Sequence, residues 1–177
     1  YYNHRSSPRD STNSALMLDS RFSQFAMYVQ EIQIYHCSAD RKGVPIGGKI
    51  VPRYRSLGMN WHLGWNGIDG GSGVPDFFLL TAGEITSPSR TLTFTEIQDF
   101  SICWPFFGIR PYDEFQMLPG SYHRKGSIVS FCDGHVEWKR WTDVRTFNPP
   151  LRTDWHSHNY QSANNKDMHW LQTRAGR

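Results

Sequence analysis

The sequence predicts an α+β domain built around a small antiparallel sheet, and three patterns carry this prediction. Residues 127–141 hold two β-prone runs around the turn-forming pair Asp133-Gly134, which is typical of a β-hairpin. Residues 91–99 alternate between apolar and polar side chains, as a half-buried strand does. An apolar stripe at positions i, i+3, i+4 and i+7 predicts a short helix over residues 19–30 that packs on the sheet.

The hairpin has a defined expected register. Asp133-Gly134 is preferred in type I′ turns because both central residues need a positive φ. A two-residue turn of this kind pairs Cys132 with His135. One face of the hairpin is then apolar, with Val129, Phe131, Val136 and Trp138. The other face is polar, with Ser130, Cys132, His135 and Glu137.

Composition excludes several classes of protein. The chain has 177 residues with 38% apolar and 15% aromatic side chains and a net charge of +3, which predicts one folded domain rather than a disordered chain. Its apolar runs, such as Phe77–Leu80, are far shorter than the roughly 18 residues of a membrane-spanning helix. Basic residues are dispersed among acidic ones, which argues against a dedicated nucleic-acid binder.

The two ends of the chain read as less regular. Residues 1–18 are polar and predict an irregular lead-in, and the sequence starts at Tyr1 with neither an initiating Met nor a recognisable secretory signal. Residues 149–177 follow a Pro-Pro pair and predict an extended tail held by aromatic side chains. Three cysteines, Cys37, Cys103 and Cys132, lack C-x-x-C spacing, so one disulfide with a free thiol and three reduced thiols both remain open.

His123 is followed by nine residues and then by Asp133-Gly134. This spacing resembles the H-X9-DG signature of the prepilin-type, pseudopilin-like proteins of planctomycetes and verrucomicrobia. Four other blocks resemble the family in the same order: the Cys37-Ser38-Ala39-Asp40 block, the block that ends in Met59-Asn60, the strand that ends in Glu96, and the ending Trp170-Leu171-Gln172.

The resemblance implies a type IV pilin-like head whose N-terminal hydrophobic helix is absent from this sequence. It also implies an extracytoplasmic, bacterial, non-enzymatic subunit of a filament, a pilus or a type II secretion apparatus. Such a subunit works by self-assembly, as a homo-oligomer, and by contact with pilus or secretion components, and it meets the membrane only through the missing helix. The chain is therefore expected to be the head of a longer precursor.

Three roles are open for the signature residues. His123 can hydrogen-bond a neighbouring strand or the Asp133 carboxylate and so hold both turns in place. Asp133 can bind calcium or another cation with loop carbonyls, as related secretion pseudopilins bind calcium, and Glu96 is a further weak metal candidate. The same region can serve as a recognition surface for a partner. Glu96 continues the apolar face of its strand, so it needs a partner unless the strand ends there.

Two functions from other classes remain as alternatives, and no catalytic residue is assigned in the leading hypothesis. A secreted carbohydrate-binding module would use Trp61, Trp65 and Trp104 as an aromatic platform. A metal-dependent hydrolase would use His123, Asp133, His135 and Glu96. In the pilin-like hypothesis, the exposed tryptophans and the polar hairpin residues His135 and Glu137 form the interaction surface.

Overall fold

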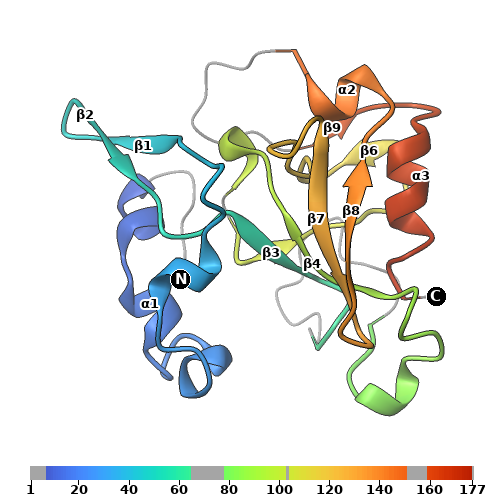
Figure 1. Ribbon diagram of the computed structural model, residues 1–177, viewed down its shortest axis with the longest axis horizontal. Coiled ribbons are helices and arrows are strands. Elements are labelled where there is room, and N and C mark those ends of the chain that lie inside the picture. Colours follow the sequence, from blue (N-terminus) through green and yellow to red (C-terminus); the bar gives the residue numbers. More distant parts are fainter. Residues whose placement is uncertain (1–6, 65–77, 103, 151–158, 177) are drawn as a thin grey trace.

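A five-stranded sheet organises the computed structural model, which describes residues 7–64, 78–102, 104–150 and 159–176 (Figure 1). Its strand order is β5-β3-β4-β7-β8. The strands are β3 (Leu57–Asn60), β4 (Leu92–Glu96), β5 (Phe106–Phe107), β7 (Gly126–Phe131) and β8 (Val136–Arg140). All neighbouring pairs are antiparallel except β3 and β5, which are parallel. The α+β class is therefore confirmed, and the strand expected over 91–99 is β4.

Short elements surround this sheet. Two-stranded ribbons are formed by β1 (Gly43–Ile46) with β2 (Lys49–Pro52), and by β6 (Glu114–Phe115) with β9 (Tyr160–Gln161). The α-helices are α1 (Ala15–Leu18), α2 (Val144–Phe147) and α3 (Lys166–Gln172). The 3-10 helices are η1 (Pro8–Thr12), η2 (Gln24–Met27), η3 (Ile32–Tyr35), η4 (Ala82–Glu84) and η5 (Asp99–Ser101).

The hydrophobic core lies on the side of the sheet that α3 covers. Along β7 the side chains of Val129 and Phe131 are buried, while Ile128, which precedes Val129, is exposed on the opposite face, as the period of two requires. The core cluster joins these residues to Met168 and Leu171 of α3.

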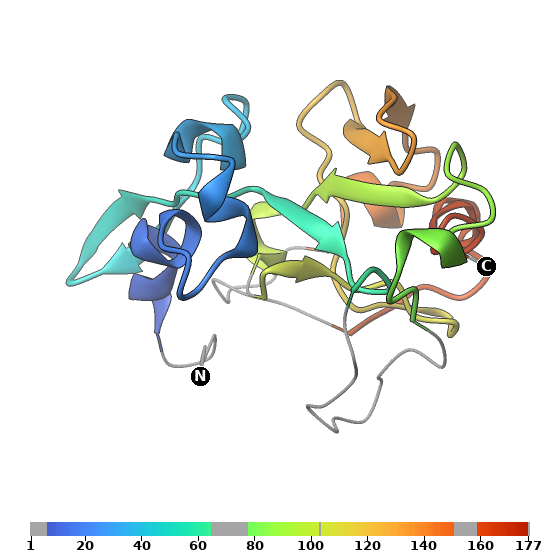
Figure 2. The same cartoon turned by 90° about the horizontal axis from the view of Figure 1, so that it is seen from below.

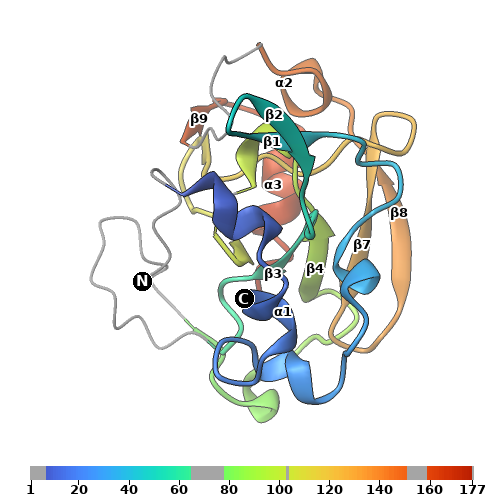
Figure 3. The same cartoon turned by 90° about the vertical axis from the view of Figure 1, so that its left-hand side faces the viewer.

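The N-terminal segment lies on the other side of the sheet. Figure 2 shows this segment and α3 at opposite ends of the molecule, with the sheet between them. Seen from the N-terminal side, α1 and the β1-β2 ribbon lie in front of the sheet (Figure 3). None of the helices in the described ranges combines the length and the apolar content needed to cross a bilayer.

The helix predicted over residues 19–30 is wrong. Within that range the structure has only the 3-10 helix η2, and α1 lies earlier, inside the expected lead-in. Asp19 explains the break, because its carboxylate accepts hydrogen bonds from the backbone and the guanidinium of Arg21. Such local side-chain bonds compete with helical backbone bonds, and the result is a turn.

The hairpin forms, but one residue out of the predicted register. Ser130 pairs with Val136, where Phe131 was expected to do so. The turn is longer than predicted, because the Phe131 N–H donates to the His135 carbonyl at 3.0 Å and leaves residues 132–134 as the loop. Of these three residues only Gly134 has a positive φ, of 91°. A type I′ turn needs two such residues, whereas a three-residue loop with glycine at its last position needs one. The slip places Val136 and Trp138 on the exposed face, away from the core residues Val129 and Phe131.

Because Gly134 has a positive φ, we expect the substitution Gly134→Ala to lower the stability of the folded protein. A Cβ at this position meets no atom within 4 Å, so the cost of Gly134→Ala comes from backbone strain alone. We expect the free energy of unfolding to fall by about 1–2 kcal/mol. Urea denaturation measures the loss, and Gly83→Ala, with open surroundings and no positive φ, is the matched control. Equal losses in the two variants would contradict this explanation.

The extended tail predicted over 149–177 is also wrong where α3 forms. Asn165 caps this helix, because its Oδ1 accepts hydrogen bonds from the backbone N–H groups of Asp167 and Met168. Met168 and Leu171, three positions apart, bury one face of the helix in the core. Packing of that face makes a seven-residue helix stable within a polar segment.

Candidate functional site

Glu96 is a buried carboxylate at the end of β4. Its side chain is 2% exposed. Oε2 accepts hydrogen bonds from the Ser127 hydroxyl at 3.2 Å and from the Ile128 backbone N–H at 3.0 Å. Oε1 lies 2.9 Å from Nε2 of His123. The partner expected for Glu96 is therefore present, and it comes from the segment that precedes β7.

A tight loop holds His123 in this position. His123 and Gly126 exchange two backbone hydrogen bonds, of 3.1 and 3.0 Å, across Arg124 and Lys125, which both have a positive φ. The indole N–H of Trp138 donates to the His123 carbonyl at 2.8 Å. Of the roles open for His123, a bond to a neighbouring strand agrees with this geometry.

Cys37 is the third member of the cluster. It follows η3, and its backbone N–H donates to the Ser56 hydroxyl at 2.6 Å. Its Sγ lies 3.3 Å from the His123 Nε2 and accepts the Ala39 N–H at 3.4 Å. Sequence reasoning missed Cys37 as a site residue, since it lies 86 positions from His123. The only signal was that its block precedes the Glu96 and His123 blocks in the family order.

The three side chains converge on one point rather than forming a relay. Sγ of Cys37, a Glu96 oxygen and a His123 nitrogen all lie within 4.8 Å of one another. In a nucleophile-base-acid triad, the nucleophile and the acid face different nitrogens of the imidazole. Here both face Nε2. Burial, followed by the hydrogen bond to Glu96, raises the pKa of Cys37 to about 11, which is the opposite of what a thiolate nucleophile needs.

Asp133 and His135 lie at the hairpin turn and are not part of this cluster. Nδ1 of His135 is 2.6 Å from Oδ1 of Asp133, and the hydrogen bond from His135 holds the pKa of Asp133 below its usual value. The alternative in which His123 bonds the Asp133 carboxylate is therefore not observed. The hydrolase set of His123, Asp133, His135 and Glu96 is not assembled either. In the part of the chain that the structure describes, the one His/Cys/Asp/Glu group with metal-like spacing is Cys37, Glu96 and His123.

The aromatic platform is not supported by the positions of its members. Trp61 is 3% exposed, and its indole N–H donates to the Ile109 carbonyl at 3.0 Å. Trp104 is half-buried and stacks on Phe106 with ring centroids 5.3 Å apart. Trp65 lies outside the described residues. Trp61 therefore cannot offer a ring face to a sugar. Of the polar hairpin residues assigned to the interaction surface, Glu137 lies exposed on β8.

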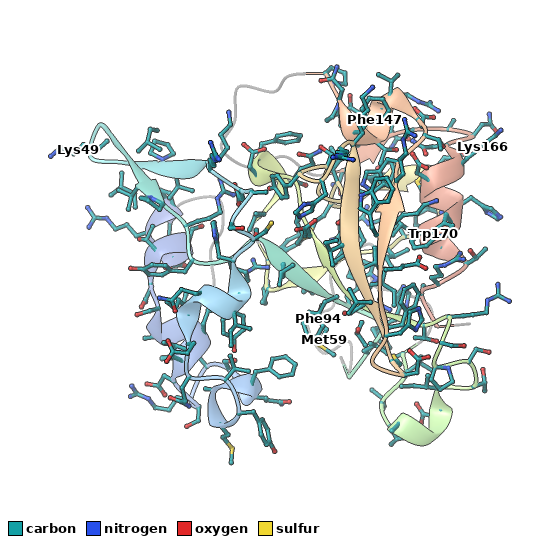
Figure 4. All side chains as sticks on the ribbon, viewed as in Figure 1. Lys49, Met59, Phe94, Phe147, Lys166 and Trp170 are labelled. Atoms are coloured by element: carbon teal, nitrogen blue, oxygen red, sulfur yellow. The ribbon has the colours of Figure 1, made fainter. Side chains whose placement is uncertain are left out.

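An apolar groove separates the N-terminal segment from the outer face of the sheet. It has a volume of about 640 Å³, and its lining includes Phe22, Phe25, Met59, Phe94, Ile128 and Val136. Met59 and Phe94 are cross-strand partners on β3 and β4 and lie together in Figure 4. Phe25 reaches the floor from the N-terminal side, with its ring 5.8 Å from that of Phe94.

Two of the three cysteines are free thiols, Cys37 and Cys132, and Cys103 lies outside the described residues. Comparison of the chain with models of known protein families, with curated proteins and with solved structures finds no match. Two features of the described residues are candidates for a functional role: the Cys37/Glu96/His123 cluster and the apolar groove.

Proposed function

We propose that this protein is a non-enzymatic, pilin-like structural subunit that assembles through apolar contacts. The apolar groove is the observation that carries the proposal. Because the sequence resembles the H-X9-DG family, we assign the subunit to an extracytoplasmic filament, pilus or type II secretion apparatus.

The lining of the groove favours an uncharged, hydrocarbon-rich occupant. Among the described residues that line the groove only Arg55 is charged, and its guanidinium is already bonded to the carbonyls of Leu57 and Trp104. These described residues therefore offer a charged small-molecule substrate no free counter-charge. Contiguous exposed apolar surface of this kind is typical of protein interaction sites.

The shape of the groove favours a protein surface. Its floor is a strand face with Met59, Phe94 and Ile128, and its opposite wall is the N-terminal segment with Phe22 and Phe25. A sheet face of this type is normally covered by another element of secondary structure. We therefore assign the groove to an apolar surface of a neighbouring subunit.

A matched pair of valines tests this assignment. Val136 lines the groove and is 60% exposed, whereas Val144 in α2 is 56% exposed and lies outside it. We expect Val136→Glu to weaken self-association by about tenfold or more, because a carboxylate would be buried against apolar side chains. Val144→Glu should associate as the wild-type protein does.

Sedimentation over a range of concentrations, with electron microscopy for filaments, measures the effect. A wild-type protein that stays monomeric at all concentrations would contradict the proposal. Equal association of the two variants would contradict the role of the groove.

A further inference from the structure

We propose that Cys37, Glu96 and His123 form a zinc-binding site with a fourth coordination position open to solvent. This inference goes beyond the structural role proposed above and stands on a different part of the molecule. It follows from the donor types, their spacing, the charge balance and the access to the cluster.

The donor set suits Zn²⁺. Thiolate sulfur, imidazole nitrogen and carboxylate oxygen are its usual protein ligands. In a tetrahedral zinc site the bonds are about 2.3 Å to sulfur and about 2.0–2.1 Å to nitrogen and oxygen. These bond lengths place the sulfur about 3.6 Å from the imidazole nitrogen and the carboxylate oxygen about 3.4 Å from the same nitrogen. The distances in the protein are 3.3 Å from Sγ to Nε2 and 2.9 Å from Oε1 to Nε2. Shifts of about half an ångström would therefore open the cluster around an ion.

A divalent cation also balances the charge of the cluster. Glu96 is almost fully buried, and the ion pair found for it among the described residues is with His123. With a thiolate, a carboxylate and a neutral imidazole as ligands, Zn²⁺ makes a centre of zero net charge, which a half-buried position tolerates best. On binding, the ion replaces the Cys37 thiol proton, which passes to solvent, and the His123 proton resides on Nδ1.

Neighbouring hydrogen-bond donors hold Glu96 and Cys37 in place, while His123 is accessible to solvent. Ser127 and the Ile128 N–H donate to the distal oxygen Oε2 of Glu96, which leaves Oε1 directed at His123. The Ala39 N–H points at Sγ of Cys37, where it stabilises a bound thiolate. Such outer contacts orient ligands before a metal binds. The side chain of His123 is 35% exposed, so an ion and a water molecule can reach the cluster.

Metal titration of the whole chain tests the site. Metal-stripped protein should bind one equivalent of Zn²⁺, and Co²⁺ in its place should give the thiolate-to-cobalt charge-transfer band of a sulfur ligand. Cys37→Ser and His123→Gln should each weaken zinc binding by about tenfold or more. Cys132→Ser and His135→Gln remove the same residue types outside the cluster and should bind as the wild type does.

Protection from alkylation tests the site without any substitution. Zinc should slow iodoacetamide modification of Cys37, mapped by peptide mass, and leave Cys132 unaffected. Binding below one equivalent, equal affinity in Cys37→Ser and Cys132→Ser, or an unprotected Cys37 would each overturn the proposal. Because Val136→Glu leaves the cluster intact, its zinc binding should be unchanged, so failure of one proposal is distinguishable from failure of the other.

Discussion

Replacing Asn60 with aspartate is expected to lower the free energy of unfolding at pH 7 by about 3–5 kcal/mol. Asn60 is fully buried at the end of β3, and its Nδ2 donates to the carbonyls of Leu92 and Ala175 at 2.9 and 3.0 Å. Aspartate has the same shape, and one of its oxygens could still accept from the His62 N–H as Oδ1 of Asn60 does at 3.2 Å. The oxygen that replaces Nδ2 would face the two carbonyl oxygens, and neither of them can donate. The loss is large because Asn60 joins β4 to the C-terminal segment.

The Asn60→Asp loss should depend on pH in a defined direction. Burial against two acceptors raises the pKa of the introduced carboxyl in the folded state above the unfolded value of about 3.9. The loss is therefore full at neutral pH and shrinks as pH falls toward 4, because the protonated acid can donate to one carbonyl.

Urea unfolding at pH 7 and pH 5 measures the difference between variant and wild type. Asn13→Asp is the control, because Asn13 is exposed and uses its oxygen as an acceptor for the Ala15 N–H. Similar losses at the two positions, or a loss at Asn60 that grows at lower pH, would contradict the explanation.

Asp167→Ala is expected to cost about 2–4 kcal/mol. Asp167 is buried in the first turn of α3, and its two oxygens accept from the Thr142 N–H, the Thr142 hydroxyl and the Asp143 N–H, all at 2.9–3.1 Å. Alanine would leave these donors without their acceptor. The contact ties α3 to the segment between β8 and α2, so its loss should loosen both.

Thermal or urea denaturation of Asp167→Ala measures this cost, with Lys166→Ala as the control. Lys166 is exposed in the same turn and points away from the sheet in Figure 4. Alanine is at least as good a helix former as lysine, so the control should be within about 0.5 kcal/mol of wild type. A similar change in both variants would show that the buried carboxylate does not anchor α3.

The apolar groove and the Cys37/Glu96/His123 cluster meet at one residue of β7. The side chain of Ile128 lines the groove, while its backbone N–H donates to Glu96. An ion at the cluster would therefore link the Cys37 segment, β4 and the His123 loop beside the surface that we assign to assembly.

Local sequence patterns predicted the strands and the hairpin, where a single pattern, alternation or a turn-forming pair, dominates the segment. The alternation before Glu96 and the Asp133-Gly134 pair led to β4 and to the β7-β8 hairpin. They did not predict the hairpin register, because one residue of loop length decides which face each side chain takes. The apolar stripe after Asp19 was misleading, since a local Asp19-Arg21 interaction replaces the helix with a turn.

The site shows the same division. From the sequence alone, Glu96 required a partner unless its strand ended there, because a carboxylate on an apolar strand face is costly without one. His123 stood out by its spacing from Asp133-Gly134. Only the tertiary structure decided that His123 is that partner, that Asp133 bonds His135, and that Cys37 joins the cluster. Periodicity and turn chemistry are local and can be read along the chain. Convergence of three side chains from distant segments depends on how the strands and loops pack, which no local pattern records.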